Sequence, residues 1–196
     1  IEIYQKIANN GTMILRLKKS VAFVGMMGAG KTAVGRAVAE KLMTSFLDSD
    51  QEIEQAANMS VAEIFARDGE AFFRDREAQV IRRLFENQVC ILSTGGGAFM
   101  SEEVREIMTS SGMSLWINAD LDLLWSRVKS KDTRPLLQTA DPYGTLKSIY
   151  EARKSTYALA DMTVKAKKGL SIDDMAERVI SAMRSRPDVL ESIDES

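Results

Sequence analysis

The feature that most constrains this chain is the segment VAFVGMMGAGKTAVGRAVAEKL at residues 21–42, where an apolar strand passes through a glycine-rich turn into a helical pattern. Gly25, Gly30, Lys31 and Thr32 occupy the fixed positions of a P-loop. Glycines let successive N–H groups point inward at an anion, and the following helix directs its positive end there. Lys31 would reach the β- and γ-phosphates, and the Thr32 hydroxyl would ligate Mg²⁺. The alternative, a turn that binds nothing, is disfavoured by the strand–loop–helix context, so the segment predicts a bound nucleotide.

Composition and charge narrow the class of protein. The 196 residues suit one domain, or a core with insertions. The net charge of −2 and pI near 5.4 argue against binding to nucleic acid or a membrane surface, and no apolar run approaches the ~20 residues of a membrane span. The single cysteine, Cys90, lies in the apolar run VCIL, which predicts a buried thiol in a reducing, cytoplasmic compartment. Because histidine is absent, a general base must be a carboxylate, hydroxyl or lysine.

Strand and helix patterns alternate along the chain. Strands are predicted at 21–24, 45–48, 89–92, 115–117 and 162–164, and helices at 31–43, 50–57, 60–69, 70–85, from 102, at 121–128 and 142–157, and from 171. This order indicates one parallel sheet with helices on both faces and ligand chemistry at the carboxyl ends of its strands. Residues 1–19 are interpreted as an N-terminal extension, 129–141 as a mobile loop and 185–196 as a flexible tail.

Polar groups follow the predicted strands. In FLDSD, Asp48 and Asp50 are two residues apart and are predicted to point the same way, one toward Mg²⁺ and one toward a hydroxyl acceptor. Either could also cap the next helix, an alternative that is stronger for Asp50 than for Asp48. Ser93 and Thr94 stand where many P-loop proteins have a metal-holding aspartate, so metal support would fall to Asp48. The glycines at 95–97 predict either a tight turn or a backbone close to a ligand.

Arginines give a third signal. Arg74 lies in GEAFFRDRE and Arg153 in YEARKSTY, and guanidinium groups bind planar carboxylates with two parallel hydrogen bonds. Each could instead be a solvated surface charge. Positive charge also gathers before and within the loop at 129–141, at Arg127, Lys129, Lys131 and Arg134. A lid that closes over ATP would place an arginine on the transferred phosphoryl group, and a basic surface loop is the alternative.

Together these residues resemble the shikimate kinase family over about residues 19–183, because GMMGAGKT, FLDSD, GEAFFRDRE, STGGG and TRPLL occur in the family's order and spacing. The resemblance implies a P-loop fold of the nucleoside-monophosphate-kinase type, with a five-stranded parallel sheet and helices on both faces. It implies a single kinase domain with a substrate-binding insertion at 51–77 and a lid at 129–141. The implied reaction is transfer of the γ-phosphoryl group of ATP to the 3-hydroxyl of shikimate, with Mg²⁺, in aromatic amino-acid biosynthesis, by a cytoplasmic monomer.

The resemblance also implies roles by position. The catalytic residues would be Lys31, Asp50 as candidate base, and Arg134 reaching from the lid. The nucleotide would be bound by Gly28, Ala29, Gly30, Lys31, Thr32, Ala33, Arg127, which would pack on adenine, and Arg134. Shikimate would be bound by Asp50, Arg74, Gly96, Gly97 and Arg153, with Glu77 orienting Arg74. Thr32 and Asp48 would hold the metal, with Ser93 supporting it through water. The chain departs from the family at Ser155, where relatives often carry proline, and in a lysine-rich lid.

Two other functions compete with this one. A kinase for another hydroxylated acid, such as gluconate, would share the P-loop but is not expected to carry FLDSD, FR and GGG together. A nucleotide-binding module without turnover would be expected to lose the groups that act on the substrate. This chain keeps those groups, namely Asp50, Arg74, Arg134 and Arg153.

Overall fold

A computed structural model describes residues 14–130 and 135–193. Its centre is a five-stranded parallel sheet in the order β3-β4-β2-β5-β6. The strands are β2 (Ser20–Val24), β3 (Ser45–Asp48), β4 (Cys90–Ser93), β5 (Gly112–Asn118) and β6 (Met162–Lys165). The predicted fold is therefore confirmed, with β2, the strand that leads into the P-loop, in the middle.

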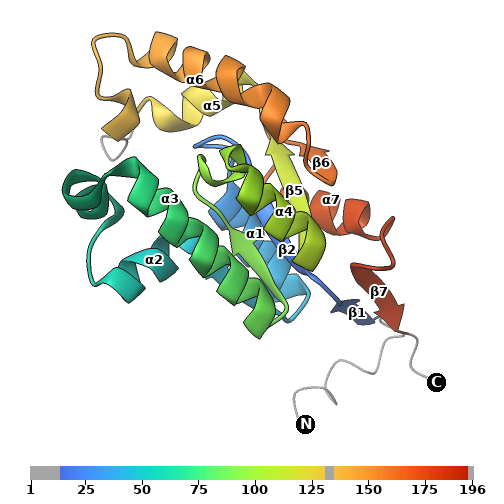
Figure 1. Ribbon diagram of the computed structural model, residues 1–196. Coiled ribbons are helices and arrows are strands. Elements are labelled where there is room, and N and C mark those ends of the chain that lie inside the picture. Colours follow the sequence, from blue (N-terminus) through green and yellow to red (C-terminus); the bar gives the residue numbers. More distant parts are fainter. Residues whose placement is uncertain (1–13, 131–134, 194–196) are drawn as a thin grey trace.

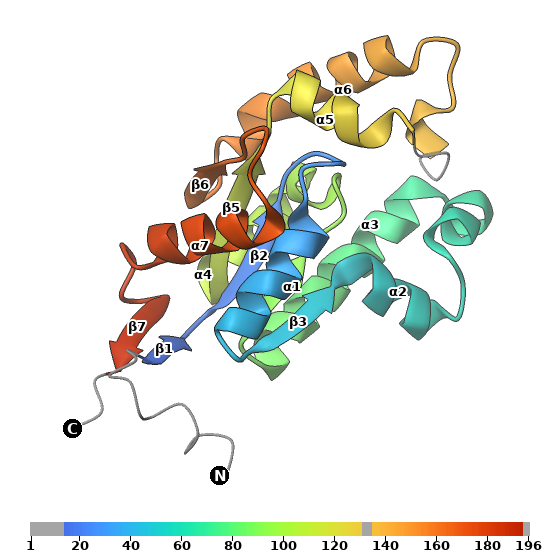
Figure 2. The same cartoon turned by 180° about the vertical axis from the view of Figure 1, so that it is seen from behind.

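Helices cover both faces of this sheet (Figures 1 and 2). The helices are α1 (Lys31–Lys41), α2 (Ser49–Ala57), α3 (Val61–Asn87), α4 (Glu102–Ser111), α5 (Leu121–Val128), α6 (Pro142–Tyr157) and α7 (Ile172–Met183). α1 and α7 pack together on one face, α4 and the second half of α3 on the other, and α5 with α6 stand above the carboxyl ends of the strands. Residues 21–24 are completely buried because β2 has neighbours on both sides and helices on both faces.

The insertion after β3 is formed by α2 and the first part of α3. Ser60 and Glu63 form the predicted capping box at the start of α3. Gly69 has φ 83° and ψ 172°, so the helix is interrupted at the predicted position although α3 continues beyond it. Ile53, Ile64 and Phe73 form a small apolar cluster of their own, separate from the main core. The insertion therefore has its own packing and stands beside the sheet (Figure 1).

The chain ends differ from the expected extension and flexible tail. β1 (Ile14–Leu17) and β7 (Leu190–Ile193) pair as a two-stranded antiparallel sheet. Leu17 and Leu190 lie opposite each other and both are buried, which gives the pair an apolar anchor to the core. Residues from both predicted irregular segments therefore form regular structure.

The predicted mobile loop at 129–141 also differs in part. Pro135–Leu137 forms a short 3-10 helix (η4), and Leu137 is buried in the main core. Lys131 and Arg134 lie outside the described residues. Within the described part of the chain, no helix is both long enough and apolar enough to cross a membrane.

Candidate active site

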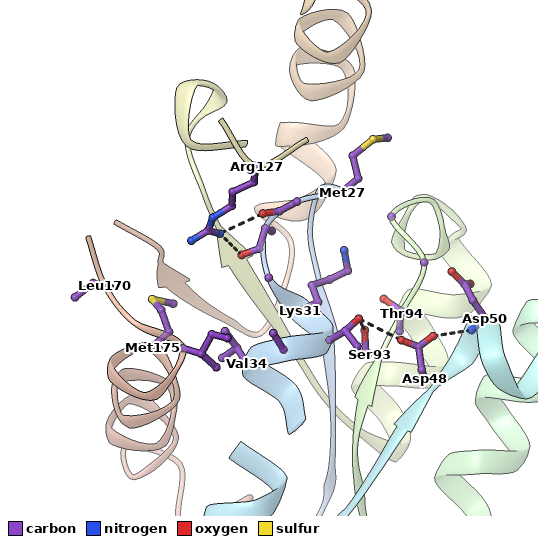
Figure 3. Close-up of a pocket in the computed structure, with 18 of the residues that line it drawn as sticks. Met27, Lys31, Val34, Asp48, Asp50, Ser93, Thr94, Arg127, Leu170 and Met175 are labelled. Atoms are coloured by element: carbon purple, nitrogen blue, oxygen red, sulfur yellow. Dashed lines mark hydrogen bonds between the residues drawn. The ribbon is translucent and has the colours of Figure 1, made fainter. Parts of the chain in front are cut away.

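A cavity of about 560 Å³ opens at the carboxyl edge of the sheet, where β2, β3 and β4 end. Its walls come from the P-loop, the ends of β3 and β4, α5 and the beginning of α7 (Figure 3). The lining includes Met27, Gly28, Ala29, Gly30, Lys31, Thr32, Ala33, Asp48, Asp50, Ser93, Gly96 and Arg127. Every predicted nucleotide-binding residue among the described residues therefore faces one cavity.

The P-loop backbone is shaped to receive an anion. Gly30, the cap residue before α1, has φ 102°. Among the described residues no side chain caps the first turn, so the amide groups of this turn are available to a phosphate. Gly25 has φ 135°, and a Cβ there would lie 2.8 Å from the Ile117 carbonyl oxygen, so only glycine fits. The Lys31 ammonium group donates to the carbonyl oxygens of Gly25 and Met26 at 2.8 and 3.1 Å, which holds it over the loop.

Arg127 braces the P-loop from α5. Its Nη1 atom donates to the carbonyl oxygens of Gly28 and Ala29 at 3.1 and 2.9 Å (Figure 3). A Cβ at Gly28 would lie 2.7 Å from Val128 Cγ1, so α5 packs closely on this part of the loop. In this structure Arg127 thus fixes the loop carbonyls at the edge of the cavity.

Three side-chain oxygens meet beside Thr32. Its Oγ1 atom lies 3.1 Å from Ser93 Oγ and donates to Asp48 Oδ2 at 3.3 Å (Figure 3). The parallel register places Asp48 directly beside Ser93, which explains why side chains 45 positions apart in the sequence converge. Hydroxyl and carboxylate oxygens are ligands that suit Mg²⁺, which usually takes one or two carboxylates and completes its shell with water and phosphate. Among the described residues no cluster of three or more His, Cys, Asp or Glu offers another metal site.

The two predicted aspartates differ in role. Asp48 caps α2, because its Oδ1 atom accepts from the Asp50 amide at 3.1 Å. The helix cap, expected more for Asp50, therefore falls to Asp48, and Asp50 lies in the first turn with its carboxylate in the cavity. Burial and the Asp48 charge raise the pKa of Asp50, and the Lys31 charge opposes this rise. A raised pKa makes Asp50 a better proton acceptor near neutral pH than an exposed aspartate.

Arg74 is held by carboxylates of its own helix. Its Nη1 atom donates to Glu77 Oε2 at 2.7 Å, and its Nη2 atom donates to Glu70 Oε1 at 3.1 Å. The Arg74 guanidinium carbon also lies 5.3 Å from the centre of the Phe73 ring. The expected contact between Glu77 and Arg74 is therefore present.

Glu77 is the most unusual carboxylate of the site. Its side chain is completely buried, and within the described part of the chain its Oε1 atom has no hydrogen-bond partner. Burial raises the pKa of Glu77 to about 7, although the charge of Arg74 acts in the opposite direction. A buried and incompletely paired carboxylate is costly, which is typical of a site organised for function.

The triple glycine lets these side chains approach the backbone. A Cβ at Gly95 would lie 2.9 Å from Asp50 Oδ1 and 3.2 Å from Glu77 Oε1, and one at Gly97 would lie 2.9 Å from Arg74 Cζ. Residues larger than glycine would displace Asp50 and Arg74, the side chains predicted to bind the substrate. The charged side chains of Asp50, Glu77 and Arg74 therefore pack directly against the backbone of the triple glycine.

Arg153 reaches the same loop from α6. Its Nη1 atom donates to the Gly96 carbonyl oxygen at 3.0 Å, and the Tyr157 hydroxyl donates to the same oxygen. A Cβ at Gly96 would lie 3.6 Å from the Met27 amide nitrogen, so this loop also touches the P-loop. The two predicted carboxylate-binding arginines thus meet at Gly96–Gly97, next to the phosphate cradle.

Two parts of the site were not predicted. Tyr157 was missed, although its position four residues after Arg153 places both on one face of a helix. The apolar wall at the start of α7, formed by Leu170, Ile172 and Met175, was also missed, because nothing local shows that α7 returns to the P-loop. Arg134 lies outside the described residues.

Comparisons with known proteins agree with one another. The family model described as "Shikimate kinase" matches residues 27–184. The shikimate kinase of Ruegeria pomeroyi is 60% identical over 175 residues, which cover 89% of this chain and 90% of that protein. The shikimate kinase of Cereibacter sphaeroides is 56% identical over 180 residues, 92% of this chain and 90% of that protein. The solved shikimate kinase of Acinetobacter baumannii, in complex with shikimate, matches with a TM-score of 0.79 and 34% identity, over 85% of this chain and 93% of that one.

Proposed function

The chain belongs to the shikimate kinase family, and on that premise we propose which of its residues move the γ-phosphoryl group of ATP to the 3-hydroxyl of shikimate. The observation that carries this assignment is that Arg74 packs against Gly97 and Arg153 donates to the Gly96 carbonyl, in a loop that lies close to the P-loop. An acceptor whose carboxylate is held there would present its hydroxyl groups to the phosphate cradle. Two arginines at this loop favour a small acid as the acceptor, because guanidinium groups bind carboxylates with strong, charge-assisted hydrogen bonds.

The arginines would select the acceptor by its carboxylate. Arg74 is already oriented by Glu77 and Glu70, and Arg153 by the Gly96 carbonyl, so little side-chain entropy remains to be lost on binding. The amide groups of Gly96 and Gly97 would add backbone contacts. Such preorganised arginines favour acceptors that carry a carboxylate, because a molecule without one would not form these charge-assisted hydrogen bonds.

Asp50 would be the general base. It lies in the cavity beside the triple glycine, and both its burial and the Asp48 charge raise its pKa. It would accept the proton of the substrate hydroxyl as the oxygen attacks phosphorus. Lys31 and the amides of the first turn of α1 would neutralise the charge that spreads over the phosphoryl oxygens.

The remaining polar groups would bind the rest of ATP·Mg²⁺. Gly28, Ala29, Gly30, Thr32 and Ala33 would surround the phosphates, and Arg127 would keep the loop carbonyls in place while lying beside adenine. Thr32 and Asp48, with Ser93 acting through water, would hold Mg²⁺, which when bound shields the negative charge of the phosphates. We assign Arg134 to the transferred phosphoryl group and residues 129–141 to the lid on the family resemblance, and residues 51–77 to substrate binding.

We further propose a monomer that acts in the cytoplasm on a small molecule, and on neither nucleic acid nor membranes. The net charge of −2 gives no overall attraction to polyanions, and the only cysteine is a buried thiol. Among the described residues the exposed large apolar side chains are scattered over several elements, as Met43, Val89, Leu136, Leu159 and Ile172 illustrate. Scattered apolar residues support a protein without a large permanent interface.

Replacement of Asp50 by Asn tests the proposed base. The asparagine side chain would keep the size of the aspartate but could not accept the proton, so kcat should fall by ~10²–10⁴ while the Kd for ATP stays within about twofold. Steady-state kinetics and nucleotide titration give both values. Asp122→Asn, an exposed change in the first turn of α5, is the matched control and should keep the wild-type rate. A fully active Asp50→Asn enzyme would show that substrate positioning, without this base, accounts for catalysis.

A further inference from the structure

We propose that Tyr157 is a positioning residue for shikimate: its hydroxyl anchors the Gly96 carbonyl and thereby fixes both the Gly97 amide and the Arg153 side chain. The inference rests on the proposed function, because it concerns the loop to which shikimate binding is assigned. Tyr157 itself is not expected to touch ATP or the reacting atoms. Loss of the Tyr157 hydroxyl should therefore weaken the binding of shikimate more than it affects any other property of the enzyme.

The Tyr157 ring is fixed by its surroundings. Only 1% of the residue is exposed, and its ring stacks beside Trp116 and Phe99, with centroid separations of 6.0 and 6.5 Å. A buried phenol requires a hydrogen-bond partner, and the Gly96 carbonyl oxygen is that partner. Because the ring cannot move without disturbing two aromatic neighbours, the hydroxyl is a hydrogen-bond donor held in a fixed position beside the glycine loop.

The Gly96 carbonyl requires a fixed hydrogen-bond partner to hold its orientation. Three consecutive glycines have no side chains to restrict the backbone, so rotation of a peptide unit there costs little. The Gly96 carbonyl and the Gly97 N–H belong to one planar peptide unit and point in opposite directions. Anchoring the carbonyl on the α6 side therefore fixes the direction of the Gly97 amide.

Tyr157 and Arg153 share this carbonyl. The two residues are four positions apart on α6 and donate to the same oxygen, whose two lone pairs can accept both hydrogen bonds. Arg74 packs closely against Gly97, the second residue of this peptide unit. A tilt of this one peptide unit would thus displace both arginines that hold the carboxylate.

The aromatic stack also borders the P-loop, so the variant used in the test has to keep the Tyr157 ring. Trp116 Cδ1 would lie 3.1 Å from a Cβ at Gly25, so removal of the whole Tyr157 ring could disturb ATP binding as well. Tyr157→Phe keeps the ring and removes only the hydroxyl. If the role of Tyr157 is purely structural, Tyr157→Phe should change the KM for both substrates and the thermal stability together. The positioning role predicts a change confined to the KM and Kd for shikimate.

The test compares Tyr157→Phe with wild type. Loss of one hydrogen bond should raise the KM and Kd for shikimate about five- to tenfold, change the KM for ATP less than about twofold, and reduce kcat less than about threefold. Shikimate Kd can be followed by fluorescence, since Trp116 lies beside Tyr157. Tyr143→Phe is the matched control, because Tyr143 is on the same helix with an exposed ring that pairs with Trp125, and it should behave as wild type.

A double-mutant cycle gives a second, independent measurement. Since both side chains hold one carbonyl, the effects of Tyr157→Phe and Arg153→Lys on shikimate Kd should be non-additive. Additive effects, an unchanged shikimate Kd in Tyr157→Phe, or equal increases in both KM values would each overturn the inference. If wild type fails to phosphorylate shikimate, the proposed function and this inference both fail. If wild type is active and Tyr157→Phe matches it, the inference alone fails.

Discussion

Glu77 lies in an unfavourable environment for a carboxylate. Its carboxylate is completely buried, yet its one ion pair, to Arg74, leaves its Oε1 atom without a hydrogen-bond partner among the described residues. This arrangement orients Arg74 but costs folding free energy, because a buried charge loses its hydration. The charge state of Glu77 therefore links protein stability to pH.

The sign of this link follows from the pKa of Glu77, which burial raises from 4.5 to about 7. Between these values the folded protein keeps a proton that the unfolded chain has released, so the free energy of unfolding should decrease as pH rises from about 4.5 to about 7. The change should be on the order of 1–3 kcal/mol. Glu77→Gln, which has no proton to release, should lose this part of the pH dependence in urea unfolding.

The control for this experiment is Glu106→Gln, which changes an exposed carboxylate on α4 and should leave the pH dependence of wild type intact. If Glu77→Gln and wild type follow the same curve from pH 4.5 to 8, then Glu77 does not take up a proton on folding in this range. Glu77 would then stay ionised beside Arg74 throughout this range of pH.

At the residue scale the sequence predicted which residues gather at the cavity better than it predicted what each of them contacts. The P-loop residues follow from a short motif and the Arg74–Glu77 contact from the family resemblance, and the structure contains both. The helix cap was an alternative role that the sequence favoured more for Asp50 than for Asp48, because both stand between a strand and a helix. The strand ends at Asp48, so Asp48 is the cap. Tyr157 was missed, since its partner Gly96 lies 61 residues away.

Among the elements, α3 has the most distinctive shape because of Gly69. At φ 83° and ψ 172° this residue occupies a region of backbone conformation that is essentially restricted to glycine, and a Cβ there would have no atom within 4 Å. The strain of a larger residue would thus come from the backbone alone. The interruption sets the direction of the helix that carries Arg74, five residues further on.

We expect Gly69→Ala to lower the free energy of unfolding by about 1–3 kcal/mol, through backbone strain without a clash. Because the start of the following helix should shift, the KM for shikimate should rise more than the KM for ATP. Ala71→Gly provides the comparison: it alters an exposed position of the same helix and should cost about 1 kcal/mol through helix propensity, with both KM values unchanged. A Gly69→Ala protein more stable than wild type would show that this conformation is not required.

Helix ends were predicted well because their signals are local. The Asp141 cap with Pro142 begins α6 at the expected residue, and α5 has the predicted limits, Leu121–Val128. β5 is longer than predicted, because Ser114 breaks its apolar pattern but is buried in hydrogen bonds to Asp161. The pairing of β1 with β7 could not be predicted, since its two short strands lie at opposite ends of the chain.

The whole molecule brings three parts of the structure together at the triple-glycine loop after β4. The sheet edge supplies the P-loop and Asp48, α2 and α3 supply Asp50, Arg74 and Glu77, and α6 supplies Arg153. The triple-glycine loop after β4 touches all three parts. We therefore expect the nucleotide to be recognised by the sheet edge and the acceptor to be chosen by the insertion together with α6.

The order of elements made this arrangement predictable in outline. Alternating apolar strands and helices require a parallel sheet, and a parallel sheet brings the polar ends of its strands to one edge. The sequence could not place α6 against the glycine loop or α7 against the P-loop, because such packing depends on the whole fold. Arg74 and Arg153 were consequently predicted as individual residues, but their common location at the glycine loop was not predicted.

The most direct test is the acceptor specificity of the wild-type protein. With ATP and Mg²⁺, turnover is measured for shikimate, quinate, gluconate and AMP, and the phosphorylated position is identified by ³¹P NMR. The account predicts shikimate 3-phosphate as the product, with kcat/KM for shikimate at least ~10² above that for every other acceptor, because the preorganised arginines and Asp50 fit its carboxylate and hydroxyl groups. No turnover of shikimate, or equal turnover of gluconate or AMP, would contradict it.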